Sequence, residues 1–124
     1  MEYKEFVQTV AERANLSREA AADLLRATLE TLGDRLSAGE VRHLATHLPE
    51  FLRKSLPARD RSRQFGLHDF VMRVGRRTGL TTKEAVDGVR AVLTTLRETV
   101  SAEAFDHVMA QLPSDFQGMV EPAS

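Results

Sequence analysis

The chain contains no cysteine and no tryptophan, and only one tyrosine, four prolines and seven glycines occur among its 124 residues. The absence of cysteine excludes disulfides, thiolate zinc sites, iron–sulfur ligation and a cysteine nucleophile. No apolar run approaches the roughly 18 residues that span a bilayer, and the mean hydropathy is −0.29. The charged, amphipathic start MEYKEFVQTVAER is unlike a signal peptide. The sequence therefore predicts a soluble, cytoplasmic protein with no membrane segment.

An excess of charge of either sign is also lacking, because 17 Lys and Arg residues stand against 18 Asp and Glu residues. The resulting net charge of −1 argues against a strongly basic nucleic-acid binder. The chain has no glycine-rich nucleotide loop, no P-loop, no HExxH motif and no GxSxG motif. It therefore predicts a protein that is not an enzyme and that carries no cofactor.

An internal repeat is the main feature of what is present. Residues 5–56 align without a gap with residues 69–120 at an offset of 64, and 17 of the 52 aligned positions are identical. A half of this size would not bury a large core alone, so the halves are expected to pack together. We interpret residues 1–124 as a single domain made of two repeats, 5–56 and 69–120, joined by a linker over 57–68.

Both repeats have the hydrophobic spacing of helices and no strand-like alternation. The spacing predicts, in each repeat, two longer helices, a third helix that ends at Leu-Pro, and a short amphipathic piece after it. The expected ranges are 3–14, 18–35, 38–48 and 50–56, then 67–78, 82–99, 102–112 and 114–120. The predicted fold is all-α: a tandem duplication of a three- to four-helix unit, packed as one pseudo-twofold helical bundle.

Local signals mark several helix ends. Asn15 and Gly79 occupy the same repeat position, and both residue types tolerate the positive φ of a left-handed helix cap. The segments 37–40 and 81–84 have the spacing of capping boxes. Gly88 lies inside a predicted helix, where glycine is unfavourable, so a close backbone approach is the expected reason; drift between the repeats is the alternative.

The two repeated segments also resemble a known family. They read EFVQTVAERANLSREAAADLLRATLETLGDRLSAGEVRHLATHLPEFL and DFVMRVGRRTGLTTKEAVDGVRAVLTTLRETVSAEAFDHVMAQLPSDF. Their paired F-V-x-x-V, L-x-x-L, S-A and L-P layouts are similar to the bacterial domain of unknown function 2267 family over nearly the whole chain. The resemblance implies an all-helical, duplicated domain, and it implies no activity or catalytic residues.

One group of residues has the spacing of metal ligands. Glu40, His43 and His47 follow each other at intervals of one helical turn, and Glu-x-x-His helices supply ligands in di-iron bundles. The second repeat lacks this set, because Gln111 stands where the first has His47. Helical-wheel positions turn all three side chains away from the apolar face. Solvated histidines are the favoured interpretation, and a metal-dependent enzyme is the remote alternative.

Two other charged patterns recur in both repeats. Arg13 and Arg77 fall in the last turn of a helix, where a cation complements the helix dipole, so a structural role is favoured over anion binding. Asp23 and Arg26, repeated at positions 87 and 90, have the spacing of a weak exposed ion pair; a repeated contact surface for a partner is the alternative.

The only sizeable charge asymmetry is a basic run over residues 53–63. It contains five cations and one anion, and it could receive a nucleic acid or another anionic partner. A solvated linker is the favoured interpretation, because the stretch lacks stacking aromatics and a helix-turn-helix pattern. The candidate contacts are Arg53, Lys54, Arg59, Arg61 and Arg63.

The functional hypothesis from sequence is a non-catalytic helical module for protein–protein interaction or regulation, with an unknown protein partner or a second copy of the chain. Binding of a nucleic acid or another anionic partner through residues 53–63 is the alternative hypothesis.

Overall fold

The computed structural model describes residues 1–57 and 63–120, and all the regular structure within these ranges is helical. The all-α prediction is therefore confirmed for this part of the chain, which contains no strand. The first half contains α1 (Tyr3–Ala14), α2 (Arg18–Arg35), α3 (Ala38–Ala45) and α4 (Glu50–Arg53). The second half contains α5 (Leu67–Thr78), α6 (Thr82–Thr99), α7 (Ala102–Ala110), the 3-10 helix η1 (Ser114–Phe116) and α8 (Gln117–Val120).

The helix ends predicted from local signals are confirmed. Asn15 and Gly79 adopt left-handed conformations, with φ of 57° and 76°, after α1 and α5 respectively. Capping boxes at Ser37 and Thr81 begin α3 and α6, since each side chain accepts a hydrogen bond from the third helical residue and that residue's carboxylate accepts one in return. These local interactions fix where each chain segment turns.

The third helix of each half is shorter than the predicted ranges 38–48 and 102–112. Helix α3 ends at Ala45 and α7 ends at Ala110. Beyond Ala45 the chain tightens into a turn in which His47 and Leu48 donate to carbonyls three residues earlier. The proline that follows each leucine disfavours helical dihedrals in the preceding residue, so the last turn does not continue as an α-helix.

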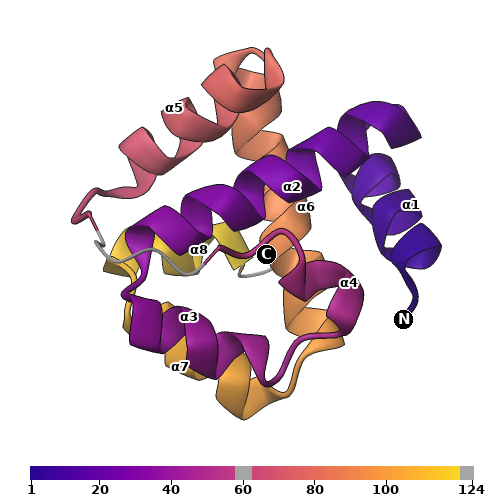
Figure 1. The fold of residues 1–124 in the computed structure, drawn as a ribbon. Coiled ribbons are helices and arrows are strands. Elements are labelled where there is room, and N and C mark those ends of the chain that lie inside the picture. Colours follow the sequence, from indigo (N-terminus) through magenta and orange to yellow (C-terminus); the bar gives the residue numbers. More distant parts are fainter. Residues whose placement is uncertain (58–62, 121–124) are drawn as a thin grey trace.

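The helices of the two halves are interleaved (Figure 1). Helices α2 and α6 cross at the centre; α1 packs against both of them, and so does α5. Helix α3 packs beside α7. The first helix of each half therefore contacts the second helix of the other half as well as its own.

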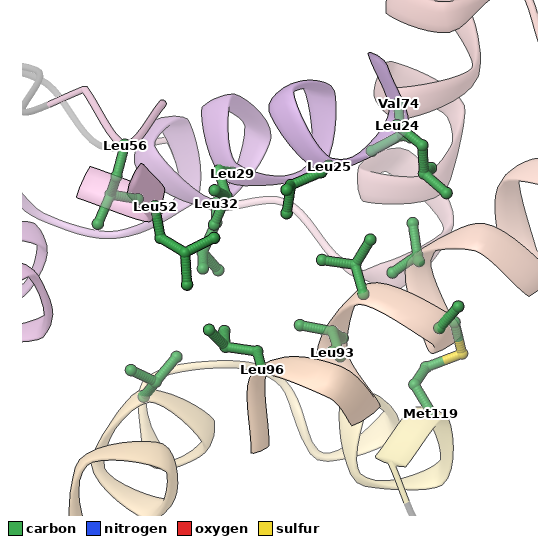
Figure 2. Close-up of a cluster of buried hydrophobic side chains, with 14 of the residues drawn as sticks. Leu24, Leu25, Leu29, Leu32, Leu52, Leu56, Val74, Leu93, Leu96 and Met119 are labelled. Carbon is green, nitrogen blue, oxygen red and sulfur yellow. The ribbon is translucent and has the colours of Figure 1, made fainter. Parts of the chain in front are cut away.

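A shared hydrophobic core lies between the halves (Figure 2). Its side chains come from every longer helix, and Figure 2 shows leucines of α2 facing those of α6. Fully buried members are Phe6, Leu24, Leu29, Leu32, Leu52, Phe70, Leu93, Leu96 and Phe116. Neither half buries its apolar face without the other, because the core residues of α2 and α6 belong to one continuous cluster.

Gly88 lies where α6 meets α2. A Cβ atom at Gly88 would lie 2.7 Å from both Cδ atoms of Leu24, so the close neighbour at this glycine is a side chain and not the backbone that was predicted. Gly33 is confined by the backbone, because a Cβ there would lie 2.7 Å from the carbonyl oxygen of Pro57. At both positions a larger residue would place its side chain in space that a neighbouring residue already occupies.

The connector between the halves ends on a buried aromatic ring. Residues 63–66 have no regular structure, and α5 begins at Leu67, within the predicted linker 57–68. Phe65 is buried, with its ring 6.3 Å from that of Phe70 and the Arg73 guanidinium 4.1 Å above it. The Nε atom of Arg35 donates to the Phe65 carbonyl at 2.8 Å. These contacts attach the end of the connector to α2 and α5.

Candidate functional site

Three of the four histidines gather on the surface where α3 meets α7. His43 and His47 are exposed as predicted, and so is His107. The ring centroids of His43 and His107 lie 4.5 Å apart, and those of His43 and His47 lie 5.3 Å apart. The sequence signal for the pair was available, since His43 and His107 occupy the same repeat position. The contact between α3 and α7 was not predictable from either repeat alone.

Glu40 does not join the histidines as a ligand. Its carboxylate accepts a hydrogen bond from the Ser37 backbone N–H at 2.8 Å, as part of the capping box of α3. In the ranges that the structure describes, no group of three or more His, Asp or Glu side chains is placed to hold a metal ion. The remote candidate set Glu40, His43 and His47 is therefore not assembled into a three-ligand centre.

The basic run is only partly visible as a site. Arg59 and Arg61 lie outside the described residues. Arg63 is exposed, and its backbone N–H donates to the carbonyl of Asp34 at 3.0 Å. Arg53 ends α4, and Lys54 directly after it is exposed. Of the described cations, Arg53 and Lys54 thus lie before the connector and Arg63 lies within it.

Lys54 lines a surface cleft with a second cation. The cleft has a volume of about 370 Å³, and its lining consists of Arg26, Glu30, Lys54, Ser55 and Pro57. Arg26 is well exposed, and the contact it makes with Asp23 is long, at 4.0 Å. The weak ion pair predicted here is thus confirmed for the first half.

The aligned arginine of the second half behaves differently. Arg90 donates from Nη1 to the carbonyl of Gly118 at 3.1 Å, and Asp87 pairs with Lys83 at 3.1 Å. Gly118 is the residue that aligns with Lys54. The second half therefore ties its arginine to the backbone of α8, whereas the first half keeps Arg26 at an open cleft.

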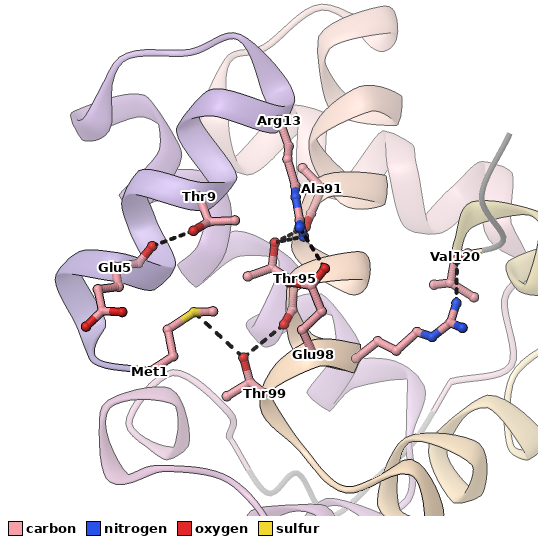
Figure 3. Close-up of polar contacts among 10 residues, drawn as sticks. Met1, Glu5, Thr9, Arg13, Ala91, Thr95, Glu98, Thr99 and Val120 are labelled. Atoms are coloured by element: carbon pink, nitrogen blue, oxygen red, sulfur yellow. Dashed lines mark hydrogen bonds and ion pairs between the residues drawn. The ribbon is translucent and has the colours of Figure 1, made fainter.

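Arg13 and Arg77 connect the two halves, and Figure 3 shows the contacts of Arg13. Arg13 donates to Thr95 Oγ1 at 3.0 Å and pairs with Glu98 at 2.6 Å. A structural role was predicted, but through the end of its own helix; the guanidinium instead reaches α6 of the other half. The structural role and the position of Arg13 in the last turn of α1 are confirmed, but local spacing did not indicate its partners, which lie more than 80 residues away along the chain.

Arg77 makes the matching contacts in the opposite direction. It donates to Thr31 Oγ1 at 2.8 Å and pairs with Asp34 at 2.7 Å. Thr31 aligns with Thr95, and Asp34 aligns with the acidic Glu98. An arginine, a threonine and an acidic residue thus recur as a set, and this recurrence was the signal that could have revealed the contact.

The other buried polar side chains also serve the fold. The hydroxyls of Thr28, Thr31 and Thr95 each donate to the carbonyl four residues earlier in their own helix. Every buried side-chain nitrogen or oxygen among the described residues has a hydrogen-bond partner. The polar groups of this interior are therefore engaged in helix–helix and intrahelical contacts.

One carboxylate has a perturbed acidity. The backbone N–H of Thr81 donates to Glu84 at 2.9 Å, and this bond, with that of the Thr81 side chain, holds the pKa of Glu84 below its usual range. The group lies on the surface at the start of α6, so its ionised state stabilises a helix N-terminus and does not mark a reactive site.

A second cleft, of about 430 Å³, opens beside α7 and α8. Its lining includes Arg97, Phe105, Asp106 and Met109, but Arg97 donates to the carbonyl of Val120 at 2.8 Å. One of the two charged side chains that line this cleft thus holds the last described residue in place. None of the helices within residues 1–57 and 63–120 is both long and apolar enough to cross a membrane.

The structure as described defines a helical protein with a continuous core and arginine contacts between its halves. The model of the Uncharacterized conserved protein (DUF2267) family matches residues 3–119, and the chain belongs to this family. The resemblance noted in the sequence is therefore confirmed. No curated protein matches the chain.

Proposed function

We propose that the protein is a non-catalytic helical module that binds another polypeptide, either a different protein or a second copy of this chain. The observation that carries the proposal is that the interior polar side chains are engaged in contacts that hold the fold together. Arg13 and Arg77, which reach the buried Thr95 and Thr31, are engaged in linking the halves. A scaffold held in this way leaves its outer helix faces as the surface for function.

We further propose that the scaffold consists of two copies of one unit related by a pseudo-twofold axis. Residues touch their own symmetry equivalents only near such an axis. Leu24 is in van der Waals reach of the Gly88 position, and the ring of His43 lies against that of His107. Both pairs are separated by the repeat offset of 64. The reciprocal contacts of Arg13 and Arg77 support the same symmetry.

Reconstitution with purified components tests the binding role. A protein captured by the intact chain is purified separately, and its binding to the chain is measured by isothermal titration calorimetry. The proposal expects saturable binding with a fixed stoichiometry. The variant Gly88→Leu forces a side chain against Leu24 and so destabilises the fold. It is the control for non-specific binding to core residues that become exposed. Equal binding by this destabilised variant, or turnover of a substrate by the wild type, would contradict the proposal.

Binding of a nucleic acid or another anionic partner is the second candidate function. It is favoured by the cleft in which Arg26 and Lys54 lie without the backbone contact that holds Arg90. We propose that this pair, with Arg53 beside it, attracts phosphate groups. Glu30 in the same lining opposes the attraction and limits it to weak binding.

A labelled single-stranded oligonucleotide tests this second candidate. Affinity should fall steeply between low and moderate salt, because each neutralised phosphate releases counterions. The double variant Arg26→Gln and Lys54→Gln should abolish binding, and Lys83→Gln, an exposed cation on α6, should not. The triple variant in which Arg59, Arg61 and Arg63 are replaced by alanine measures how much the connector contributes to the affinity for the oligonucleotide. Undiminished binding in both multiple variants would remove the candidate.

A further inference from the structure

The contact between α3 and α7 brings together two histidines from opposite halves. His43 and His107 are exposed, their rings are tilted by 50°, and their centroids lie 4.5 Å apart. Beneath them, buried apolar residues hold the two helices, among them Leu44 of α3 and Val108 of α7. The backbone positions of the pair are therefore set by packing, while the rings reach solvent.

We propose that His43 and His107 together bind one divalent transition-metal ion of the kind that prefers imidazole nitrogen, such as zinc or nickel. Two nitrogens that share a tetrahedral zinc ion at its usual bond length lie about 3.3 Å apart. Rings whose centroids are 4.5 Å apart reach this separation with small side-chain rotations. Water completes the coordination, since the protein supplies two ligands at this place.

The neighbouring side chains define the limits of the site. Glu40 is engaged in the capping box at the start of α3. His47 approaches His43 at 5.3 Å between ring centroids, from the turn after α3. His43 and His107 form the pair that spans the halves. His43 and His47 form the competing pair within the first half, and the experiment distinguishes the two. Oxygen-preferring cations such as magnesium are poor occupants of an imidazole site.

A bound ion would act as a clip between the repeats. It would link position 43 of α3 to position 107 of α7. Any ligand that binds only the folded state raises stability by mass action. Metal should therefore raise the unfolding temperature. This inference does not depend on the proposed binding of a polypeptide.

Calorimetric titration of the untagged, chelator-treated protein with zinc chloride and nickel chloride tests the site. The wild type should bind one ion per chain, and magnesium should give no heat of binding. His43→Gln and His107→Gln should each weaken binding by at least about tenfold. His68→Gln removes the remaining histidine, which is exposed on α5 and outside the cluster, and should leave the affinity unchanged. Glutamine is a conservative choice, because it stands at position 111, which aligns with His47.

Thermal unfolding provides the second readout. Zinc should raise the unfolding temperature of the wild type and of His68→Gln, and it should raise that of His107→Gln by less. Equal unfolding temperatures without metal show that the variants remain folded. The proposal is overturned if no ion binds, if His68→Gln loses binding, or if His47→Gln loses binding while His107→Gln retains it.

Discussion

Leu24 packs directly onto Gly88, the residue that aligns with it at the sequence offset of 64. The leucine is fully buried, and both its Cδ atoms lie 2.7 Å from the place where a Cβ of residue 88 would stand. A large side chain of α2 thus lies against a residue of α6 that has none.

This contact predicts that the effect of Gly88→Ala on the free energy of unfolding changes sign when Leu24 is replaced by alanine. Gly88→Ala alone should lower the free energy of unfolding by about 1–2 kcal/mol, since overpacking outweighs the gain in helix propensity. Leu24→Ala alone should lower it by about 2–5 kcal/mol through the cavity it leaves. In the Leu24→Ala background, Gly88→Ala should raise it by up to about 1 kcal/mol. Urea unfolding of all four proteins measures the cycle, and additive effects would contradict the contact.

The arginine contacts between the halves predict unequal losses. Arg77→Met should lower the free energy of unfolding by about 1–3 kcal/mol, and Arg13→Met by roughly half as much. The difference follows from exposure, because Asp34 is only 14% exposed in its pair with Arg77, whereas Glu98 is 45% exposed in its pair with Arg13. Methionine keeps the apolar stem.

Arg76→Met is the matched control for these variants, since Arg76 is an exposed neighbour on the same helix turn. Its effect should stay within about 0.5 kcal/mol. Equal losses for Arg76→Met and Arg77→Met would show that charge in this turn, and not the contact with the other half, determines stability.

The left-handed caps predict a ranking at Gly79. Its φ is 76°, and nothing lies within 4 Å of an added Cβ, so a substitution meets conformational strain without a clash. Gly79→Ala should lower the free energy of unfolding by about 1 kcal/mol. Gly79→Asn should lower it less, because Asn15 adopts the same conformation after α1. Thermal or urea unfolding decides the ranking, and an equal loss for both variants would contradict it.

Glu84 predicts a dependence of stability on pH. Its pKa lies below the ordinary value of 4.5 in the folded protein, so ionised Glu84 stabilises the fold above that pH. The contribution is lost as the pH falls through the lower folded value. Glu84→Gln keeps a hydrogen-bond acceptor but no charge. The variant should be less stable than wild type at pH 7, and the difference should shrink in urea unfolding below pH 4.5. A difference independent of pH would contradict this role.

The sequence was informative wherever the physical cause is local. Asn15 and Gly79 ended their helices because of backbone freedom, and Ser37 and Thr81 began theirs through caps within three residues. A close neighbour was expected at Gly88 because glycine is unfavourable inside a helix and needs a structural reason there. Such features depend on residues a turn apart and are legible without knowledge of the fold.

Features that depend on distant parts of the chain were less accessible. The partners of Arg13 are on α6, and helical periodicity does not indicate which helix lies opposite. The helical-wheel prediction that His43 faces solvent is confirmed. The proximity of His107 depends on the packing of α3 against α7 and was not predicted. The open cleft at Arg26 arises from a difference between halves, which the repeat itself obscures.

The most direct test of a binding role is the native mass of the untagged protein isolated from its own cells without overproduction. The account predicts a species heavier than one 13.8 kDa chain, with the additional mass equal to a second copy or to another polypeptide. That species should re-form from purified components. A single chain at every concentration tested, or a chain carrying a cofactor and turning over a substrate, would contradict the account.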